Sequence, residues 1–227
     1  MDYFIIDGKS STEMGIVLES VPGIDMPEER GTHYTVMGRA GDVFVPDGTG
    51  IYDPYIKSLR IFVQGADNVH AVQRWLRGQH NITFSTEPDR VQPCRILSGA
   101  TFTKVSPYVD WYGGTINIKC QPYKYRAHAQ TTELLPGARV VNLGDADELP
   151  VFHVTGRGTV SIAIDDGTPF TVDVPGMAVI DCEALITTAD GEMLITSGEY
   201  PRIPTGYHTI TFTDGFGVRM TRRERFV

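Results

Sequence analysis

Short stretches in which apolar and polar residues alternate fill most of the 227-residue chain, and glycine, proline and aspartate separate them. This period-two pattern is typical of β-strands that bury one face. In the first part of the chain it predicts strands at residues 3–8, 15–20, 55–64, 81–85, 91–97, 100–105 and 115–121. The segments Glu-Pro-Asp, Ser-Gly and Tyr-Gly-Gly are expected to form turns between them.

Residues 32–54 have the pattern of a hairpin arm. The β-prone run from Thr32 leads into Gly-Arg-Ala-Gly-Asp, whose glycines and aspartate favour a tight turn. Val43-Phe-Val is the expected returning strand, and Pro-Asp-Gly and Gly-Thr-Gly follow it. We therefore expect a hairpin with exposed turns.

The segment Asp67–Gly78 has helical periodicity instead. Val69, Val72 and Leu76 fall at positions i, i+3 and i+7, which places them on one face of a helix of about three turns. Asp67 is the expected N-cap and Gly78 the expected stop. We expect this helix to pack its apolar face on a sheet.

From Pro150 onward the chain reads as a compact all-β unit. Strands are expected at residues 151–154, 159–164, 170–174, 178–183, 185–187, 207–212 and 218–222. Asp-Gly pairs between several of them are typical of hairpin turns. Short strands at this spacing predict a β-sandwich.

Charge divides unevenly along the chain. Residues 1–130 hold 13 Lys+Arg and 14 Asp+Glu, whereas residues 131–227 hold 7 and 14, which together give the net charge of −8. Residues 131–149 are polar and acidic, with weak periodicity. We therefore predict a first domain over residues 1–130, a linker or irregular entry over 131–149, and a second domain over 150–227.

Composition argues against several classes of protein. No apolar run approaches the roughly 20 residues that span a bilayer, and the start of the chain lacks the features of a signal peptide. The basic cluster Arg222–Arg225 is short and contains an acid, so no sequence-specific nucleic acid and no membrane are expected as partners. Cys94, Cys120 and Cys182 are too scattered for a disulfide framework, which predicts small buried thiols.

Candidate catalytic and metal-binding motifs are weak. The six histidines lack the spacing of a metal site, and no serine lies in the context of a nucleophile elbow. Asp165-Asp166-Gly fits a type I′ hairpin turn better than a pair of catalytic carboxylates or a calcium loop. The sequence therefore predicts no enzyme, no cofactor and no metal.

Asp110-Trp-Tyr-Gly-Gly has two interpretations. It can be a loop that stacks a sugar on Trp111, or a strand entry whose aromatic side chains pack in a core or an interface. A carbohydrate-binding β-sandwich module that acts in host-surface adhesion therefore remains an alternative function.

Short motifs follow one another along nearly the whole chain. They are Phe4-Ile-Ile-Asp-Gly, Met14-Gly-Ile-Val-Leu, Val36-Met-Gly-Arg-Ala-Gly-Asp, Ile51-Tyr-Asp-Pro-Tyr-Ile, Trp75-Leu-Arg-Gly, Thr83-Phe-Ser-Thr-Glu-Pro-Asp-Arg, Cys120-Gln-Pro-Tyr-Lys-Tyr, Ile180-Asp-Cys-Glu, Gly198-Glu-Tyr-Pro-Arg-Ile-Pro-Thr-Gly and Arg219-Met-Thr-Arg-Arg. In this order they resemble distal tail proteins of long-tailed, non-contractile phages. One turn departs from that family, because Met37-Gly-Arg-Ala-Gly stands where the family usually has Pro-Gly-Arg-Asp-Gly.

The resemblance implies a structural protein of a phage tail tip. Its mainly β fold would comprise an N-terminal β-sandwich, or belt domain, with one α-helix and an arm hairpin, followed by a C-terminal galectin-like β-sandwich. Belt domains would close into a homohexameric ring that connects the tail tube protein to the tail-associated hub protein, with receptor-binding or baseplate proteins as further partners. The protein would be assembled in the host cytoplasm and reside in the virion, at the distal end of the tail.

Ring formation is expected through the first domain, since its near-neutral charge permits close packing of copies. The expected contacts are the arm and the strand ends near Tyr123. The candidate interface residues are Tyr34, Met37, Arg39, Asp42, Phe44, Tyr52, Tyr55 and Tyr123. Sugar binding is not carried over to the second domain, because the chain has no tryptophan beyond residue 130.

Overall fold

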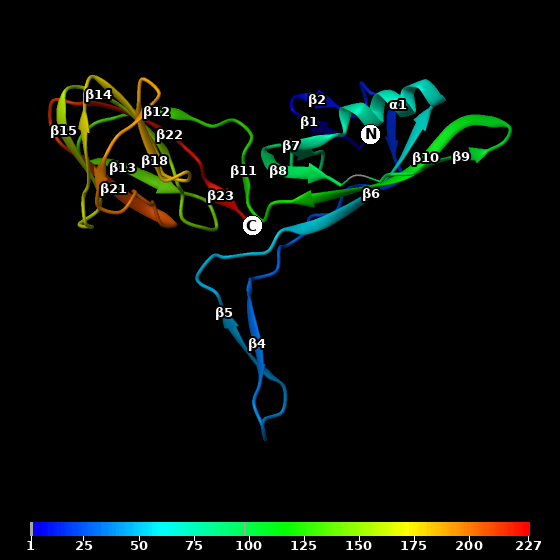
Figure 1. The fold of residues 1–227 in the computed structure, drawn as a ribbon, viewed down its shortest axis with the longest axis horizontal. Helices are drawn as coiled ribbons and strands as arrows, with labels where there is room; N and C mark the ends of the chain where they lie inside the picture. Colours follow the sequence, from blue (N-terminus) through cyan, green and yellow to red (C-terminus); the bar gives the residue numbers. More distant parts are fainter. Residues whose placement is uncertain (1, 98) are drawn as a thin grey trace. The chain divides into compact units, whose positions relative to one another are not determined.

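The computed structural model describes residues 2–97 and 99–227. The chain divides into two compact units, one up to Ala127 together with Val227, and the other spanning His128–Phe226 (Figure 1). Both are built mainly from β-strands, as the alternation predicts, and one helix is present among the described residues.

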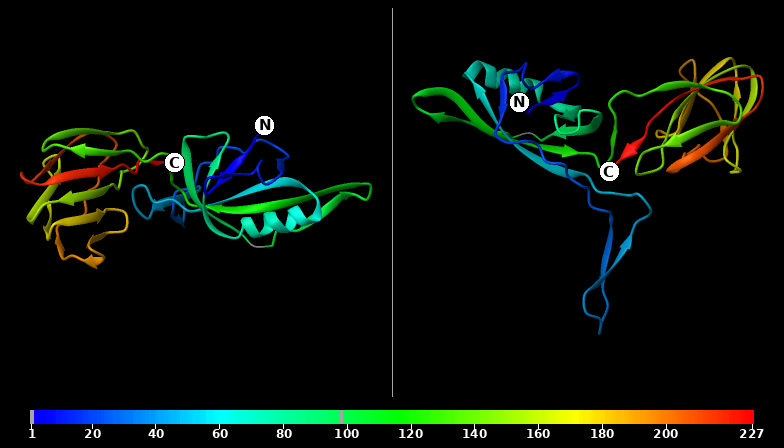
Figure 2. Two further views of the ribbon diagram at one scale, coloured as in Figure 1. Left: turned by 90° about the horizontal axis from the view of Figure 1, so that it is seen from above. Right: turned by 180° about the vertical axis from the view of Figure 1, so that it is seen from behind.

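The first unit is built on one antiparallel sheet, in the order β2-β1-β7-β8-β10-β6-β3, with β9 beside β10 and β11 beside β8 (Figures 1 and 2). The strands are β1 Phe4–Ile6, β2 Lys9–Ser10, β3 Ile16–Leu18, β6 Tyr55–Gln64, β7 Gly78–Phe84, β8 Arg90–Ile96, β9 Phe102–Ser106, β10 Val109–Cys120 and β11 Lys124–Arg126. All of β6 pairs with β10, from Tyr55 opposite Cys120 to Gln64 opposite Trp111.

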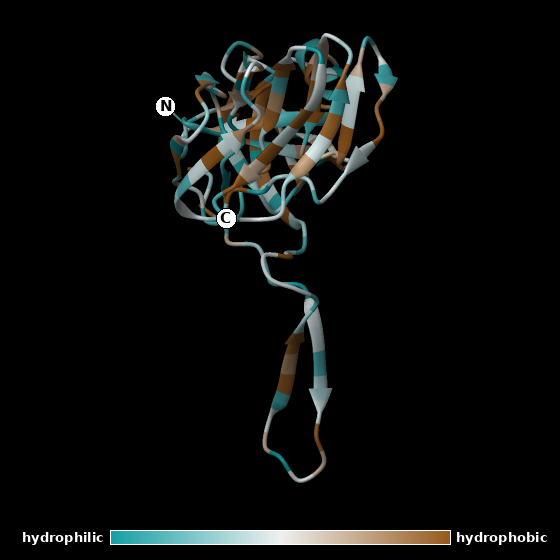
Figure 3. Cartoon of the chain, turned by 90° about the vertical axis from the view of Figure 1, so that its left-hand side faces the viewer, coloured by the Kyte–Doolittle hydropathy of each residue, from teal (hydrophilic) through white to brown (hydrophobic). Residues whose placement is uncertain are grey.

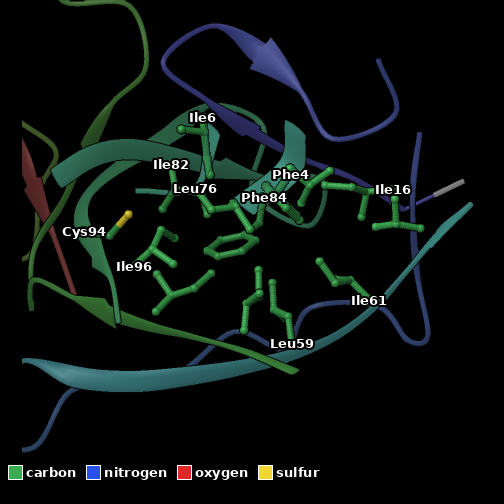
Figure 4. Close-up of a cluster of buried hydrophobic side chains, with 14 of the residues drawn as sticks. Phe4, Ile6, Ile16, Leu59, Ile61, Leu76, Ile82, Phe84, Cys94 and Ile96 are labelled. Carbon is green, nitrogen blue, oxygen red and sulfur yellow. The ribbon is translucent and has the colours of Figure 1, made fainter. Parts of the chain in front are cut away.

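The sheet curves around an apolar core. Figure 4 shows Phe4, Ile6 and Ile82 pointing toward Leu59 and Ile61 from the opposite side of this core. Strand alternation explains the arrangement, because buried residues in β6 and β10 occupy every second position.

Helix α1, Ala66–Trp75, covers part of this core, and Val69, Val72 and Leu76 are buried there as predicted. Two expectations about its ends are wrong. The N-cap is Gly65, which makes no side-chain cap, and Asp67 instead lies in the first turn. The helix ends at Trp75 with Leu76 as its C-cap, so Gly78 opens β7 rather than stopping the helix.

The predicted Tyr-Gly-Gly turn is also wrong, because Tyr112, Gly113 and Gly114 lie inside β10. A Cβ atom at Gly113 would come within 2.9 Å of the Phe62 side chain, and one at Gly114 within 2.8 Å of the Phe102 side chain. These glycines therefore make room for two aromatic rings that lie across the strand, and they do not mark a reversal of the chain.

The second unit is a sandwich of two antiparallel sheets (Figure 2). One has the order β12-β22-β14-β17-β18-β19 and the other β13-β21-β15-β16-β20. Their strands are β12 Thr131–Leu134, β13 Ala138–Asn142, β14 Val151–Thr155, β15 Gly158–Ile164, β16 Phe170–Val174, β17 Met177–Asp181, β18 Ile186–Ala189, β19 Glu192–Met193, β20 Thr196–Ser197, β21 Gly206–Phe212 and β22 Gly217–Thr221. The short strand β23, Arg225–Phe226, belongs to neither of these sheets. Phe152, Phe170 and Ile180 are fully buried between the sheets.

Residues 131–149 are not the irregular linker that the composition suggested. Strands β12 and β13 pair with β22 and β21, so each extends a sheet of the sandwich. The acidic residues misled the prediction because Glu148 is fully buried. It accepts hydrogen bonds from Arg222 Nε and Nη2, both at 2.6 Å, and from the Arg223 backbone N–H at 2.9 Å.

This correction predicts different behaviour for two fragments. Residues 128–226 should fold alone with a cooperative thermal transition, whereas residues 140–227 lack β12 and the buried Leu134. Losing one buried leucine alone costs about 2–5 kcal/mol, a large part of the roughly 5–15 kcal/mol that holds a small domain folded. Circular dichroism melts of both fragments test this, and equal cooperativity would contradict it.

Candidate assembly surface on the β4–β5 arm

The arm hairpin forms where the sequence predicts it. Strands β4, Gly31–Thr35, and β5, Asp42–Pro46, pair only with each other among the described residues. Their register sets Thr35 opposite Asp42 and Gly31 opposite Pro46. The hairpin extends away from the sheet of its own unit (Figures 1 and 3). A two-stranded ribbon of this kind is marginally stable in water by itself.

One face of the arm is occupied by its own side chains. His33 and Phe44 lie directly opposite each other, with their ring centroids 4.9 Å apart. The Nδ1 atom of His33 lies 2.6 Å from Oδ2 of Asp42, which is diagonal to it on the same face. The side chains of His33, Asp42 and Phe44 therefore contact one another on this face, which we call the internally paired face, while they remain partly exposed.

The other face is apolar and open. The register places Thr32 beside Val45 and Tyr34 beside Val43. Tyr34 is 54% exposed and Val45 47%, and next to them in the turn Met37 is fully exposed. Figure 3 shows the hydrophobic stretch of β5 along the arm. We call this face, formed by Thr32, Tyr34, Val43 and Val45, the open arm face.

The root of the arm is fixed to the body of the unit. Arg30 Nε donates to Asp53 Oδ1 at 2.7 Å, and the rings of Tyr52 and Tyr123 meet edge to face with centroids 5.8 Å apart. The hydroxyl of Tyr123 also donates to the carbonyl of Gly50. The arm is thus held at its base, while its length carries an uncovered apolar face.

The segment that leads into the arm has a second attachment. Lys57 in β6 is 7% exposed, and its Nζ lies 2.5 Å from Asp25 Oδ2 and also donates to the Gly23 carbonyl. An ammonium group this buried needs such partners. Because β6 begins directly after the arm, the two chain segments flanking the arm are tied to one strand.

The eight candidate interface residues therefore separate into groups. Tyr34 lies on the open arm face, and Met37 and Arg39 lie in the turn. Asp42 and Phe44 lie on the opposite, internally paired face, and Tyr52 and Tyr123 lie at the root.

Tyr55 lies elsewhere, in β6, where its hydroxyl donates to Gln92 Oε1 at 3.2 Å and burial raises its pKa. Sequence reasoning missed Val43 and Val45. Alternation within Asp42–Pro46 marks these valines as one face of β5, but deciding that the face is open requires the register of the hairpin.

The other features considered from the sequence are a metal site, a membrane span, the cysteines and the segment around Trp111. Across residues 2–97 and 99–227 no group of three or more His, Cys, Asp or Glu side chains is arranged to hold a metal ion, and no helix is long and apolar enough to cross a membrane. Burial raises the pKa of the Cys94 and Cys182 thiols to about 12 and that of Cys120 to about 11. Trp111 and Tyr112 are half-buried within β10 and do not form a loop.

Comparison with known proteins bears on the fold. A crystal structure of SPP1 Dit (gp 19.1), described as a paradigm of the hub adsorption apparatus in Gram-positive infecting phages, superposes with a TM-score of 0.78 over 100% of both chains, at 18% sequence identity. The chain has the Dit fold. No protein-family model and no curated protein matches the sequence itself. Both units and the arm fall within the Dit fold, since the match covers the whole chain.

The exposed arm gives a prediction for the unassembled chain. Backbone amides of Thr32–Tyr34 should exchange with deuterium roughly tenfold or more faster than those of β6 and β10, because the arm has no core of its own. Hydrogen-exchange mass spectrometry at low protein concentration measures this. Equal protection in the arm and in β10 of a monomer would contradict the assignment of an uncovered face.

Proposed function

We propose that this protein is a distal tail protein, a structural subunit of a phage tail tip. The observation that carries the proposal is the Dit fold over the whole chain, since Dit is described as a hub of an adsorption apparatus. The open arm face supports it, because an apolar face on an extended hairpin is stabilised when another protein covers it.

A second copy of the chain is the proposed occupant of the open arm face. In a cyclic assembly each subunit binds its neighbour through two different surfaces. The projecting arm of one copy would bind a separate surface on the next copy, and this arrangement can close into a ring. We propose six copies, as the resemblance to distal tail proteins implies. The ring would join the tail tube protein to the tail-associated hub protein, and receptor-binding or baseplate proteins would attach to it.

The second unit is proposed to be a galectin-like sandwich that decorates this ring. The proposal assigns it a structural role and no sugar site. Carbohydrate binding at residues 105–115 finds no support in the fold, because Trp111 and Tyr112 form part of the β10 ladder with β6. The protein is proposed to reside at the distal end of the virion tail after assembly in the host cytoplasm.

A pair of variants at neighbouring residues tests the arm. Tyr34→Lys places a charge on the open arm face and should weaken assembly roughly tenfold or more. Thr35→Lys adds the same charge next to it on the opposite face, facing Asp42, and should leave assembly nearly unchanged. Light scattering across a concentration series should give six times the 25.1 kDa chain mass for the wild type and for Thr35→Lys.

Deleting residues 33–50 provides an independent check. The deletion removes most of the hairpin and leaves β6 and its ladder in place, so the protein should stay folded but form no ring. A ring of unchanged mass, or equal loss in both lysine variants, would refute the assigned role of the arm.

A further inference from the structure

The two units contain the same short sequence in corresponding strands. Strand β7 reads Gly78-Gln-His-Asn-Ile-Thr-Phe, and β21 reads Gly206-Tyr-His-Thr-Ile-Thr-Phe. Both follow the pattern Gly-x-His-x-Ile-Thr-Phe, and in both the isoleucine and the phenylalanine are buried. The pattern escaped the sequence analysis because the two copies lie 128 positions apart in otherwise dissimilar surroundings.

The strand paired with each copy is also equivalent. In the first unit Ile6 lies opposite Ile82, and Asp7 follows it directly. In the second unit Ile164 lies opposite Ile210, and Asp165 follows it directly. Each aspartate adopts a left-handed backbone conformation, with φ of 48° at Asp7 and 50° at Asp165. A non-glycine residue in this region is uncommon and needs local support.

The aspartates receive that support from the partner strand. The Asp7 backbone N–H donates to the Asn81 carbonyl at 3.0 Å, and the Asn81 N–H donates to Asp7 Oδ1 at 2.9 Å. The Asp165 N–H donates to the Thr209 carbonyl at 2.8 Å, and the Thr209 N–H donates to Asp165 Oδ1 at 2.8 Å. The two contact sets match atom for atom.

The histidine completes the arrangement in each unit. His80 Nδ1 lies 2.7 Å from Asp7 Oδ2, and its Nε2 lies 2.9 Å from the Arg77 carbonyl. His208 Nδ1 lies 2.6 Å from Asp165 Oδ2, and its Nε2 lies 3.4 Å from the Thr205 carbonyl. The side chains of His80 and His208 are only 11% and 15% exposed.

Glycine two residues before each histidine shapes the second contact. Gly78 has φ of 111° and Gly206 has φ of 105°, values that side-chain-bearing residues rarely adopt. The carbonyl that faces each Nε2 belongs to the residue just before this glycine. The glycine common to both copies thus bends the chain so that the carbonyl of the preceding residue meets the imidazole.

Both ring nitrogens of each histidine therefore face oxygen atoms that can only accept hydrogen bonds. A neutral imidazole carries one N–H and can satisfy one of them, whereas the imidazolium carries two and satisfies both. We propose that the two units share a histidine clamp, in which the imidazole joins the left-handed aspartate turn to the Gly-x-His-x-Ile-Thr-Phe strand, and that in the second unit this clamp depends on a proton held by His208. The clamp is a property of the single chain and does not depend on ring formation.

The charged groups around each clamp are different. His208 faces the carboxylates of Asp165 and Asp147, and uncharged Val140 lies opposite it on β13. His80 faces the carboxylate of Asp7 from the β1–β2 turn.

Strand β8 places the neutral Cys94 thiol directly opposite His80, and Arg95 and Lys119 line the same open groove of about 480 Å³ as His80. Acidic neighbours surround the second clamp, and both signs of charge surround the first.

The expected pH dependence follows from these contacts. The hydrogen bond with Asp165 raises the pKa of His208, so its contribution to stability is complete below its ordinary value of 6.5 and is lost as pH rises through the raised pKa. Hydrogen bonds from His208 and Thr209 lower the pKa of Asp165, so its contribution is present above 3.8 and is lost as pH falls through the lowered value.

Asp7 behaves like Asp165: burial acts to raise its pKa, but hydrogen bonds from Asn81 and His80 outweigh burial and lower it. The second clamp should therefore contribute most between the limits set by Asp165 and His208.

Thermal unfolding of the full chain as a function of pH tests the clamp. His208→Gln should lower the Tm by roughly 2–4 °C at about pH 5.5, and by clearly less at about pH 8.5. His80→Gln removes the equivalent contacts of the first unit and should also lower the Tm. His33→Gln is the matched control, because His33 also contacts an aspartate, Asp42. Its side chain is 58% exposed, and among the described residues its ring nitrogens contact this one hydrogen-bond acceptor. A Tm loss of His208→Gln that is the same at both pH values would overturn the proposal.

A spectroscopic measurement on the folded wild type covers variants that fail to fold. Imidazole ¹⁵N chemical shifts should report two protonated ring nitrogens in His208 near neutral pH, and Asp165→Asn should move that titration to lower pH. Asparagine keeps an oxygen that accepts from the Thr209 N–H, but it removes the negative charge beside His208. The variant therefore distinguishes the effect of the charge on His208 from the effect of the turn geometry. A neutral tautomer of His208 near pH 6, or a titration unchanged by Asp165→Asn, would show that the contacts are merely structural.

Discussion

The ladder between β6 and β10 is the constraint on which the first unit depends. Every residue of β6 pairs with β10. This long pair lines one side of the core, packs against α1 and continues into β9, which pairs with β10. The arm enters the ladder directly, because β6 begins at Tyr55, shortly after the root contacts. A ladder with ten paired residues has one register, since a shift by one position would move Leu59 and Ile61 from the core to solvent.

The arm shows what the same backbone does without a core. A ribbon of two strands has two faces and no interior, so each side chain is covered only by its neighbours on the same face. His33, Asp42 and Phe44 contact one another in this way. Tyr34 and Val45 on the other face stay exposed in the single chain. In the proposed assembly, the contact between Tyr52 and Tyr123 at the root would limit the conformational entropy that the arm loses when its open face is covered.

Much of the fold could be predicted from period-two alternation and turn residues. The arm, the helix and most strands lie where the pattern indicates them, because each depends on local sequence. The errors occurred where distant residues decide the structure. Gly113 and Gly114 indicate a turn in the sequence, but they make room for Phe62 and Phe102, which lie far from them in the sequence or on another strand. Residues 131–149 have the composition of a linker, but Arg222 neutralises the buried Glu148. The open arm face needed the register, and the repeated clamp needed the paired strands.

The three buried cysteines have a consequence for chemical durability. Oxidants attack the thiolate, and burial keeps the thiols of Cys94, Cys120 and Cys182 almost entirely protonated at neutral pH. Their protection comes from the sandwich cores and not from the redox state of the surroundings. As long as the chain stays folded, these three sulfur atoms should therefore react slowly with oxidants and should not cross-link one copy of the chain to another.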